Sequence, residues 1–482
     1  MTKRIATVNL KKSESNLATG IVLIFIANVI NLLFSIGTNL ILPKFLSVES
    51  YAAIKTYQLY ITYVGVLHFG FNDGMYLKYG GKSFNELNKS DVLNNLSTLR
   101  IFQVVVTVIC IGVSVALKDA VLLMASIVIF PMNLKAYYQS LYQAIGEFGI
   151  YSKIMNTVTG VTFFINAILV FFFKTDNYIY YLILYVALNF VIWIALEFLF
   201  QKKAGCHIRW MVFDWKELVN QIKAGVLIML GNFSDSIMTS MDRWFVKIFV
   251  GTVAFAQYAF AVSMEHFLSV AVSPLSITLY NYLCKNIPNY KLKKLRGAIL
   301  IFSAFLVCSA FPVVFILEHF MTNYVDAIHV LILLFASQIF FTVVKCIYVN
   351  LYKAKKMQTK YFQRWISVIA VAFISNIMAY FLVKTKEAFA IATLVSAMYW
   401  FVMSAIDFKE ISYSIKEITY LIVETVCFIF CGYIFNSVVG FVAYLFLTVL
   451  ITIVLMNDSV IYMLKLISVI AKKKNDNEIE EG

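Results

Sequence analysis

Two lysines carry the most informative chemistry in this sequence, because each lies inside a long apolar stretch. Lys135 and Lys345 are 210 residues apart and share one local pattern. The copies read Phe130-x4-Lys135-x2-Tyr138-x2-Leu141-Tyr142-x-Ala144 and Phe340-x4-Lys345-x2-Tyr348-x2-Leu351-Tyr352-x-Ala354. A cation inside a membrane is costly and by default marks a functional site. Matched cations in two copies are typical of a transporter built from internal repeats.

The lysines could serve two purposes, and the sequence leaves both open. A lysine ammonium pairs with phosphate as a compact point charge, so Lys135 and Lys345 could capture an anionic head group such as a diphosphate. Alternatively, both side chains could snorkel to the cytoplasmic headgroups, since both lie in the cytoplasmic half of their predicted spans. Arg243 is a third cation inside a predicted span.

Carboxylates in the second half of the chain are candidates for ion coupling. Asp235 lies near the middle of a predicted span, Asp242 lies next to Arg243 toward its outer end, and Glu265 lies within the next span. A desolvated carboxylate favours its protonated form and can carry a proton. Asp235, Glu265 and Asp242 therefore become candidates for binding a coupling proton or sodium ion. Ion pairing in the core is the alternative, above all between Asp242 and Arg243.

The composition requires a membrane setting for these charges. Of 482 residues, 61% are apolar and 14% are charged, and long apolar runs recur from end to end. The runs are solid rather than alternating, which predicts helices and argues against a barrel. We predict about 14 spans: 18–42, 52–72, 99–117, 120–145, 151–173, 178–200, 223–249, 253–283, 295–317, 325–351, 362–383, 388–407, 415–436 and 438–457.

Basic residues are unequally distributed between the two sides of the predicted membrane. With the N-terminus in the cytoplasm, about 30 of the 40 Lys and Arg residues fall in cytoplasmic segments. This asymmetry explains the net charge of +14 without a nucleic-acid partner. Both termini are expected in the cytoplasm, and the tail after Lys474 is expected to be disordered. The loop 201–222, with Trp210 and Trp215, is expected to lie on the membrane surface.

Further offsets support an internal duplication. Gly20 and Gly225 open similar apolar segments, and Tyr51 and Tyr258 lie near the start of the following helices, at offsets of 205 and 207. An even number of spans separates the copies, so they run in the same direction across the membrane. We predict a first lobe over 1–218, a second lobe over 219–413, and two extra helices with a tail over 414–482.

Polar side chains form stripes at helical spacing in four spans. The stripes consist of Asn28, Asn31, Ser35 and Thr38; Lys135, Gln139 and Gln143; Asn232, Asp235, Thr239 and Asp242; and Gln338, Thr342 and Lys345. Such faces cannot prefer lipid. They predict a water-filled cavity between two lobes, with hydrogen bonds between helices as the alternative.

Signals for catalysis are weak. The chain lacks a Gly-x4-Gly-Lys-Ser/Thr loop, its seven cysteines show no metal spacing, and no predicted external loop is long enough for an active site. We therefore predict a protein that is not an enzyme and that has no cofactor and no metal site.

Three motifs resemble the polysaccharide flippases, which export O-antigen or capsule repeat units, of the multidrug/oligosaccharidyl-lipid/polysaccharide (MOP) exporter superfamily. They are Leu42-Pro43-x2-Leu46-Ser47-x3-Tyr51, Gly70-x2-Asp73-Gly74-x4-Tyr79 and Asp242-Arg243-Trp244-x6-Gly251-x6-Tyr258-x2-Ala261. The resemblance implies an all-α integral membrane protein with two six-helix lobes around a central cationic cavity and two C-terminal helices. A family requirement for cations in the cavity would fall on Lys135, Arg243 and Lys345.

The sequence hypothesis is a flippase for undecaprenyl-diphosphate-linked oligosaccharides, which works by alternating access in the bacterial plasma membrane. Its expected partners are the lipid-linked substrate, membrane lipid, a coupling proton or sodium ion and a glycan polymerase complex. A cation-coupled drug antiporter of the same fold is the first alternative. A membrane polysaccharide polymerase or acyltransferase is the alternative from another class, and a non-transporting scaffold for glycan assembly is a third.

Overall fold

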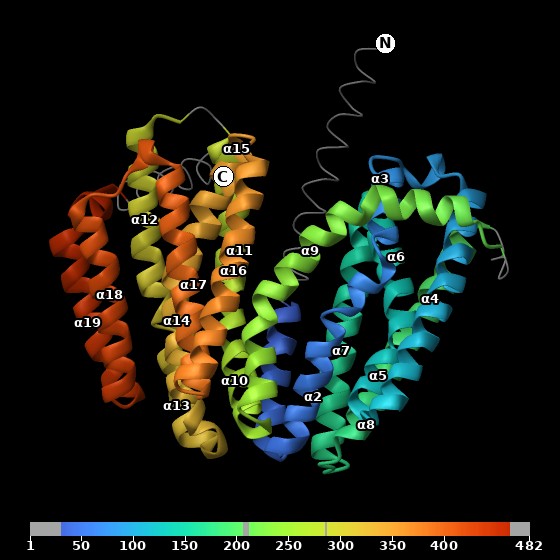
Figure 1. The fold of residues 1–482 in the computed structure, drawn as a ribbon, viewed down its shortest axis with the longest axis horizontal. Coiled ribbons are helices and arrows are strands. Elements are labelled where there is room, and N and C mark those ends of the chain that lie inside the picture. The colour runs from blue at the N-terminus through green and yellow to red at the C-terminus, as the bar shows by residue number, and fades with distance from the viewer. Residues whose placement is uncertain (1–29, 206–211, 285–286, 463–482) are drawn as a thin grey trace, which may run out of the picture. The chain divides into compact units, whose positions relative to one another are not determined.

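The chain folds into helices throughout the part that the structure describes. The computed structural model describes residues 30–205, 212–284 and 287–462, and every regular element within them is helical (Figure 1). Ten of these helices are long and apolar enough to cross a membrane, and two shorter apolar segments, Ile30–Phe45 and Asn156–Phe171, accompany them. The prediction of an all-α, multi-pass membrane protein is confirmed. The predicted disordered tail and the start of the first span lie outside the described residues.

The chain divides into two compact units, Met1–Ser240 and Met241–Gly482. In the first unit, Ile30–Phe45 is followed by seven α-helices: α2 (Val48–Ile61), α3 (Phe71–Tyr79), α4 (Lys89–Leu117), α5 (Ala120–Ile127), α6 (Ile129–Ala144), α7 (Phe148–Phe171) and α8 (Tyr178–Ala204). The division falls inside α9 (Trp215–Phe249), because the first part of this helix packs within the first unit. The lobe boundary predicted at 218 precedes it by 22 residues.

The second unit repeats this order and then adds two helices. It contains α10 (Thr252–Glu265), α11 (Ser269–Leu283), α12 (Asn289–Val307), α13 (Ala310–Phe320), α14 (Ile328–Val343), α15 (Val349–Ala354), α16 (Gln358–Leu382), α17 (Lys386–Asp407), α18 (Ile415–Ile434) and α19 (Ser437–Leu455). The helices α18 and α19 are the two extra C-terminal helices.

Local geometry matches between the two units at the predicted offset of 210. The helices α6 and α15 end at Ala144 and Ala354, and the backbone N–H groups of Glu147 and Met357 donate to the carbonyls of Tyr142 and Tyr352 at 2.9 and 2.8 Å. Tyr142 and Tyr352 are both buried. Such equivalent helix ends are expected when a sequence has been duplicated.

Left-handed backbone geometry repeats at the same spacing. Gly146 and Lys356, which follow α6 and α15, have φ angles of 76° and 56°. Lys174 and Lys384, which follow α7 and α16, have φ angles of 46° and 53°. Two turns of the same kind at one offset support the internal duplication, since non-glycine residues rarely adopt this conformation.

Short polar caps fix the ends of several helices. Asn88 accepts a hydrogen bond from the N–H of Asp91 at the start of α4, and Asp119 caps α5 at 2.9 Å. Asn436 caps α19 in the same way, at 2.9 Å. These caps satisfy amide groups that would otherwise lack partners at the helix ends.

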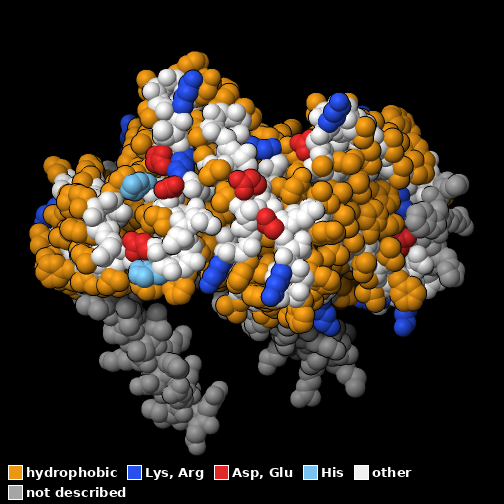
Figure 2. Space-filling view, turned by 90° about the horizontal axis from the view of Figure 1, so that it is seen from below, with side chains coloured by type: hydrophobic (Ala, Val, Ile, Leu, Met, Phe, Trp, Pro, Cys, Tyr) orange, Lys and Arg blue, Asp and Glu red, His pale blue; other side chains and the backbone are white. Residues whose placement is uncertain are grey.

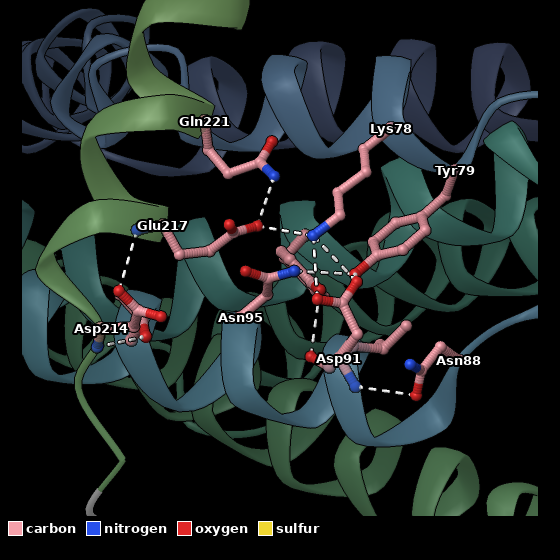
Figure 3. Close-up of polar contacts among 11 residues, drawn as sticks. Lys78, Tyr79, Asn88, Asp91, Asn95, Asp214, Glu217 and Gln221 are labelled. Atoms are coloured by element: carbon pink, nitrogen blue, oxygen red, sulfur yellow. Dashed lines mark hydrogen bonds and ion pairs between the residues drawn. The ribbon is translucent and has the colours of Figure 1, made fainter.

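A polar cluster, which we call the α9 clamp, fastens the start of α9 to α3 and α4 (Figure 3). The Lys78 ammonium donates to Glu217 at 2.6 Å and to Asp91 at 2.9 Å. Asp91 also accepts from the Tyr79 hydroxyl at 2.7 Å, and Gln221 donates to Glu217 at 2.8 Å. The end of the predicted surface segment, from Trp215 onward, thus forms the first turns of α9, which are held by one lysine between two carboxylates.

Glycines allow α3 and α9 to approach closely just beyond the clamp. A Cβ atom on Gly225 would meet the backbone of Gly70 and Gly74, and Gly70 has a φ angle of 88°. Only glycine tolerates both the conformation and the contact. Trp215 stays exposed at the start of α9, as expected for a segment that lies at a membrane surface.

The electrostatics of the clamp favour a charged lysine. Burial lowers the pKa of Lys78, but the hydrogen bonds from its ammonium to Glu217 and Asp91 outweigh this effect and raise the pKa above 10.5. A group with a raised folded-state pKa stabilises the protein fully below its unfolded-state pKa. This contribution is then lost as pH rises through the folded-state value. The lysine therefore stays charged across the neutral range.

We predict that Lys78→Ala lowers the stability of the first unit. The change leaves two neighbouring carboxylates without their shared cation, at a cost of about 1–2 kcal/mol for a partly exposed site. The thermal unfolding midpoint of the purified protein in detergent measures this loss of stability. Lys216→Ala is the matched control, because Lys216 is exposed and adjacent to Glu217. Equal midpoints for the two variants between pH 7 and 9 would contradict the clamp.

Candidate functional site

The residues predicted from sequence fall into two groups. Lys135 lies in the first unit, whereas Arg243, Asp242, Glu265 and Lys345 lie in the second. Asp235 lies in α9, and its side chain is outside the described residues. Each group is built from its own helices.

Lys135 is held inside the first unit by an amide. Its side chain, 8% exposed on α6, donates to Asn189 Oδ1 on α8 at 2.6 Å. Asn189 in turn donates from its Nδ2 to the carbonyl of Tyr185 at 2.8 Å, which fixes the amide oxygen toward the lysine. The amide is a neutral partner, so the positive charge of Lys135 is oriented but not neutralised by this contact.

Lys345 lies in the one segment of π-helix among the described residues, Val344–Tyr348. An extra residue in a helical turn displaces the side chains around it, and such turns are frequent at functional sites. The Lys345 carbonyl accepts from Ser276 Oγ on α11 at 2.9 Å, which secures the distorted turn. The Lys345 side chain is exposed, with its ammonium 5.6 Å from the centre of the Phe341 ring.

The duplicated lysines therefore differ in environment although their surroundings in sequence match. The tyrosines three residues later, Tyr138 and Tyr348, are both fully buried. Lys135 on a regular α-helix is buried against an amide, whereas Lys345 on the π-helix is exposed. The π-turn is a local difference between the two sites, and such a turn changes the direction of side chains within a single helical turn.

Glu265 joins Lys345 in a polar group that we call the α10–α14 cluster, together with Gln338 and His266. Glu265 ends α10 and accepts a hydrogen bond from Gln338 Nε2 on α14. Lys345, Asp242 and Arg243 all act electrostatically on the Glu265 carboxylate, and Lys345 and Arg243 act on His266. The second unit thus brings three of the predicted residues, Lys345, Asp242 and Arg243, within electrostatic range of a fourth, Glu265.

Asp242 is buried on α9 and makes its own set of hydrogen bonds. Its Oδ2 accepts from the Tyr258 hydroxyl at 2.7 Å and from Thr393 Oγ1 on α17 at 3.3 Å. Its Oδ1 accepts from the backbone N–H of Arg243 at 2.7 Å. The carboxylate therefore ties α9 to α10 and α17, and the sequence-level alternative of a structural role for Asp242 has clear support in these contacts.

Three further cations are buried, and each has a partner in the structure. Lys55 donates to Asn39 Oδ1 at 2.7 Å, Arg100 pairs with Glu197 at 2.7 Å, and Arg296 pairs with Glu417 at 2.5 Å. All three side chains are buried. Removing one member of a buried pair leaves a costly unpaired charge.

Sequence reasoning missed Asn189 and Thr393 as partners of the candidate residues. Asn189 is a strongly polar residue near the middle of the apolar segment 178–196, which was a usable signal. Thr393 gave no such signal in the sequence, because the hydroxyl of a threonine in a helix usually donates to a carbonyl of its own helix. Thr393 also makes this kind of bond, to the Phe389 carbonyl at 3.3 Å.

No family model and no curated protein sequence matches the chain. Several solved structures do match the chain. One, described as the lipid II flippase MurJ in an inward closed conformation, aligns with a TM-score of 0.63 at 12% identity, over 91% of this chain and 100% of that chain. A multidrug resistance MATE family transporter of the MOP superfamily, in an inward-facing conformation, aligns with a TM-score of 0.50 at 12% identity, over 79% and 95%.

The chain has the fold of MOP-superfamily transporters. The resemblance predicted from the three motifs is confirmed at the level of the fold. At 12% identity the likeness concerns the fold alone.

We predict that a thiol at position 345 is far more reactive than one at position 135. In a background without the native cysteines, Lys345→Cys should react with a charged thiol reagent about tenfold faster than Lys135→Cys, because reactivity follows exposure of the thiolate. Mass spectrometry of the labelled protein measures the rates. Size-exclusion chromatography checks that both variants fold. Equal rates would show that the π-turn does not expose position 345.

Proposed function

We propose that this protein moves a lipid-linked oligosaccharide across the plasma membrane by alternating access, and that Lys345 pairs with the diphosphate of the substrate. The exposed ammonium on a π-turn is the observation on which the proposal depends. The Lys345 ammonium lies within electrostatic range of the Glu265 carboxylate. A more strongly charged anion can replace Glu265 as the partner of this ammonium. A phosphate offers more charge and more acceptor oxygens than one carboxylate.

Lys135 has a different part in this proposal. Its ammonium is buried against the neutral amide of Asn189, so in its charged form it would supply a fixed field rather than a mobile ligand. A fixed charge in a region of low dielectric constant attracts an anion over a longer range than an exposed one. Arg243, half-buried beside Asp242, would add to this field in the second unit.

Glu265 is the best placed of the three proposed coupling residues. It lies beside an exposed lysine, and within the α10–α14 cluster it accepts a hydrogen bond from the Gln338 amide. Protonation of Glu265 would leave Lys345 without its neighbouring anion and free it to bind phosphate. Asp242 is less suitable, because three donors already hold it. Asp235 remains a candidate from the sequence alone.

A cation-coupled drug antiporter is the second candidate, since the MATE family transporter shares the fold. The cations described above favour an anionic substrate instead. An enzyme or a scaffold has no comparable support, because neither needs an exposed lysine on one membrane-spanning helix beside an acid on another.

We predict that Lys345→Ala abolishes most glycan export. Losing a charge-assisted hydrogen bond of about 1.5–3 kcal/mol corresponds to roughly a 10- to 100-fold loss of affinity. The measurement is surface glycan in a strain in which a plasmid copy replaces the chromosomal gene, at equal protein level. Lys345→Arg should restore part of the export, and Lys409→Ala is the control at an exposed position. Normal export by Lys345→Ala would reject the phosphate role.

We also predict that Glu265→Gln uncouples transport from its driving ion. Glutamine keeps the size and the hydrogen-bonding capacity toward Gln338 but cannot be ionised. In vesicles that contain the purified protein and a lipid-linked oligosaccharide, the wild type should respond to a pH or sodium gradient, and the variant should transport at one rate with or without it. A gradient response that persists in the variant would exclude Glu265 as the coupling residue.

A further inference from the structure

A cavity lies in the second unit, apart from the α10–α14 cluster. Its volume is about 480 Å³, and its lining comes from the end of α13, the start of α14, the start of α17, the end of α18 and the start of α19. This volume is within the usual range for small-molecule pockets. All of these helix ends fall on the side that the distribution of basic residues predicts to be outside.

Two aromatic rings form one wall of this cavity. His329 and Tyr433 stack with ring centroids 4.3 Å apart and an angle of 17° between their planes. Both side chains are exposed. Exposed flat rings beside polar groups are suited to a ligand that has both an apolar face and polar edges.

Carboxylates also line the cavity. The Glu318 carboxylate already accepts hydrogen bonds from the protein, because the backbone N–H of Ser437 donates to both of its oxygens at 3.2 Å. Asp326 and Glu387 also line the cavity, together with Lys386. Lys386 donates to Gln257 Oε1 and lies 4.0 Å from Glu387. Three carboxylates and one ammonium leave the cavity with a net negative charge when His329 is neutral.

The ligand class follows from these groups. Ionised carboxylates only accept hydrogen bonds, so a ligand must bring donors. The net negative charge repels anions such as phosphate or a sugar acid. A sugar ring without an acidic group meets both conditions, since its hydroxyl or amino groups donate and its C–H face can lie on an aromatic ring. Figure 2 views the molecule from below relative to Figure 1. It shows acidic and histidine side chains gathered at the left of the surface that faces the viewer.

We propose that this cavity binds a neutral or amino-bearing sugar ring. It would contact the glycan part of the substrate, whereas Lys345 would contact the diphosphate. That assignment rests on the proposed function, but the binding of sugar itself does not. Tyr433 and His329 would carry the ring face, and Asp326 and Glu387 would accept from its hydroxyl or amino groups.

Saturation-transfer difference NMR on the purified full-length chain tests the proposal. The detergent must have no sugar head group, and the probes are N-acetylglucosamine, glucosamine and glucuronic acid. We expect signals from the first two sugars that are at least fivefold stronger than those from the third. Tyr433→Ala, and Asp326→Asn combined with Glu387→Gln, should each reduce the signals at least fivefold.

Matched controls distinguish the cavity from the rest of the unit. His319→Ala removes an exposed histidine that stacks on Phe315 outside the cavity, and Glu410→Gln removes an exposed acid that pairs with Lys355. Both should leave the signals unchanged. Equal signals from all three sugars, unchanged signals in the cavity variants, or binding of Ca²⁺ without any sugar signal would each overturn the proposal.

The same measurement separates this proposal from the proposed function. Lys345→Ala should keep the sugar signals while it loses glycan export. Sugar signals in a protein that exports no glycan would preserve the cavity and reject the flippase role. Export that continues without any sugar signal would reject the cavity alone.

Discussion

Ionised and polar side chains that leave water must be matched by partners within the protein, and this constraint organises both units. Arg100 is paired with Glu197, Arg296 with Glu417, and Lys55 with Asn39. The two arginine pairs join helices that are distant in sequence, so the same contacts pair the charges and hold these helices together. Lys345 departs from this pattern, because its side chain is exposed. That departure, more than the presence of a cation, makes it a functional candidate.

The duplicated lysines show how one inherited pattern can serve two purposes. The turns that follow α6 and α15 keep the same hydrogen bonds and left-handed residues, so the backbone scaffold has been maintained. The helices before them differ, because a π-turn precedes α15 whereas α6 is a regular α-helix, and the lysine is exposed in the first case and buried against an amide in the second. Matching sequence around two charged residues therefore predicts a matching backbone more safely than it predicts a matching environment.

The helical membrane fold could be predicted from the sequence because apolar runs of sufficient length have few alternatives in a bilayer. The duplication was visible because Tyr142 and Tyr352 keep their spacing. The partners of the lysines were harder to predict. Asn189 lies 54 residues from Lys135, and Gln338 lies 73 residues from Glu265, so helix packing decides these contacts. The π-turn leaves no pattern in one sequence. The contact of Glu217 with Lys78 on α3 keeps the start of α9 in the first unit, and a contact of this kind between separate helices could not be predicted from the sequence.

The proposed sugar cavity and Lys345 cannot hold one small ligand together. His329 and Lys345 belong to the same continuous helical stretch, sixteen residues apart, which corresponds to about 24 Å at 1.5 Å per residue. This distance is most of the thickness of a bilayer core, about 30 Å. A cationic site toward one face and an acidic cavity toward the other therefore suit different parts of a ligand or different steps of its passage. The acidic cavity repels a diphosphate, so a substrate that engaged it through its glycan would have its charged head kept away from that end. Such opposite charges toward the two ends of one helical stretch would favour one orientation of a bound substrate without requiring the two sites to act at once.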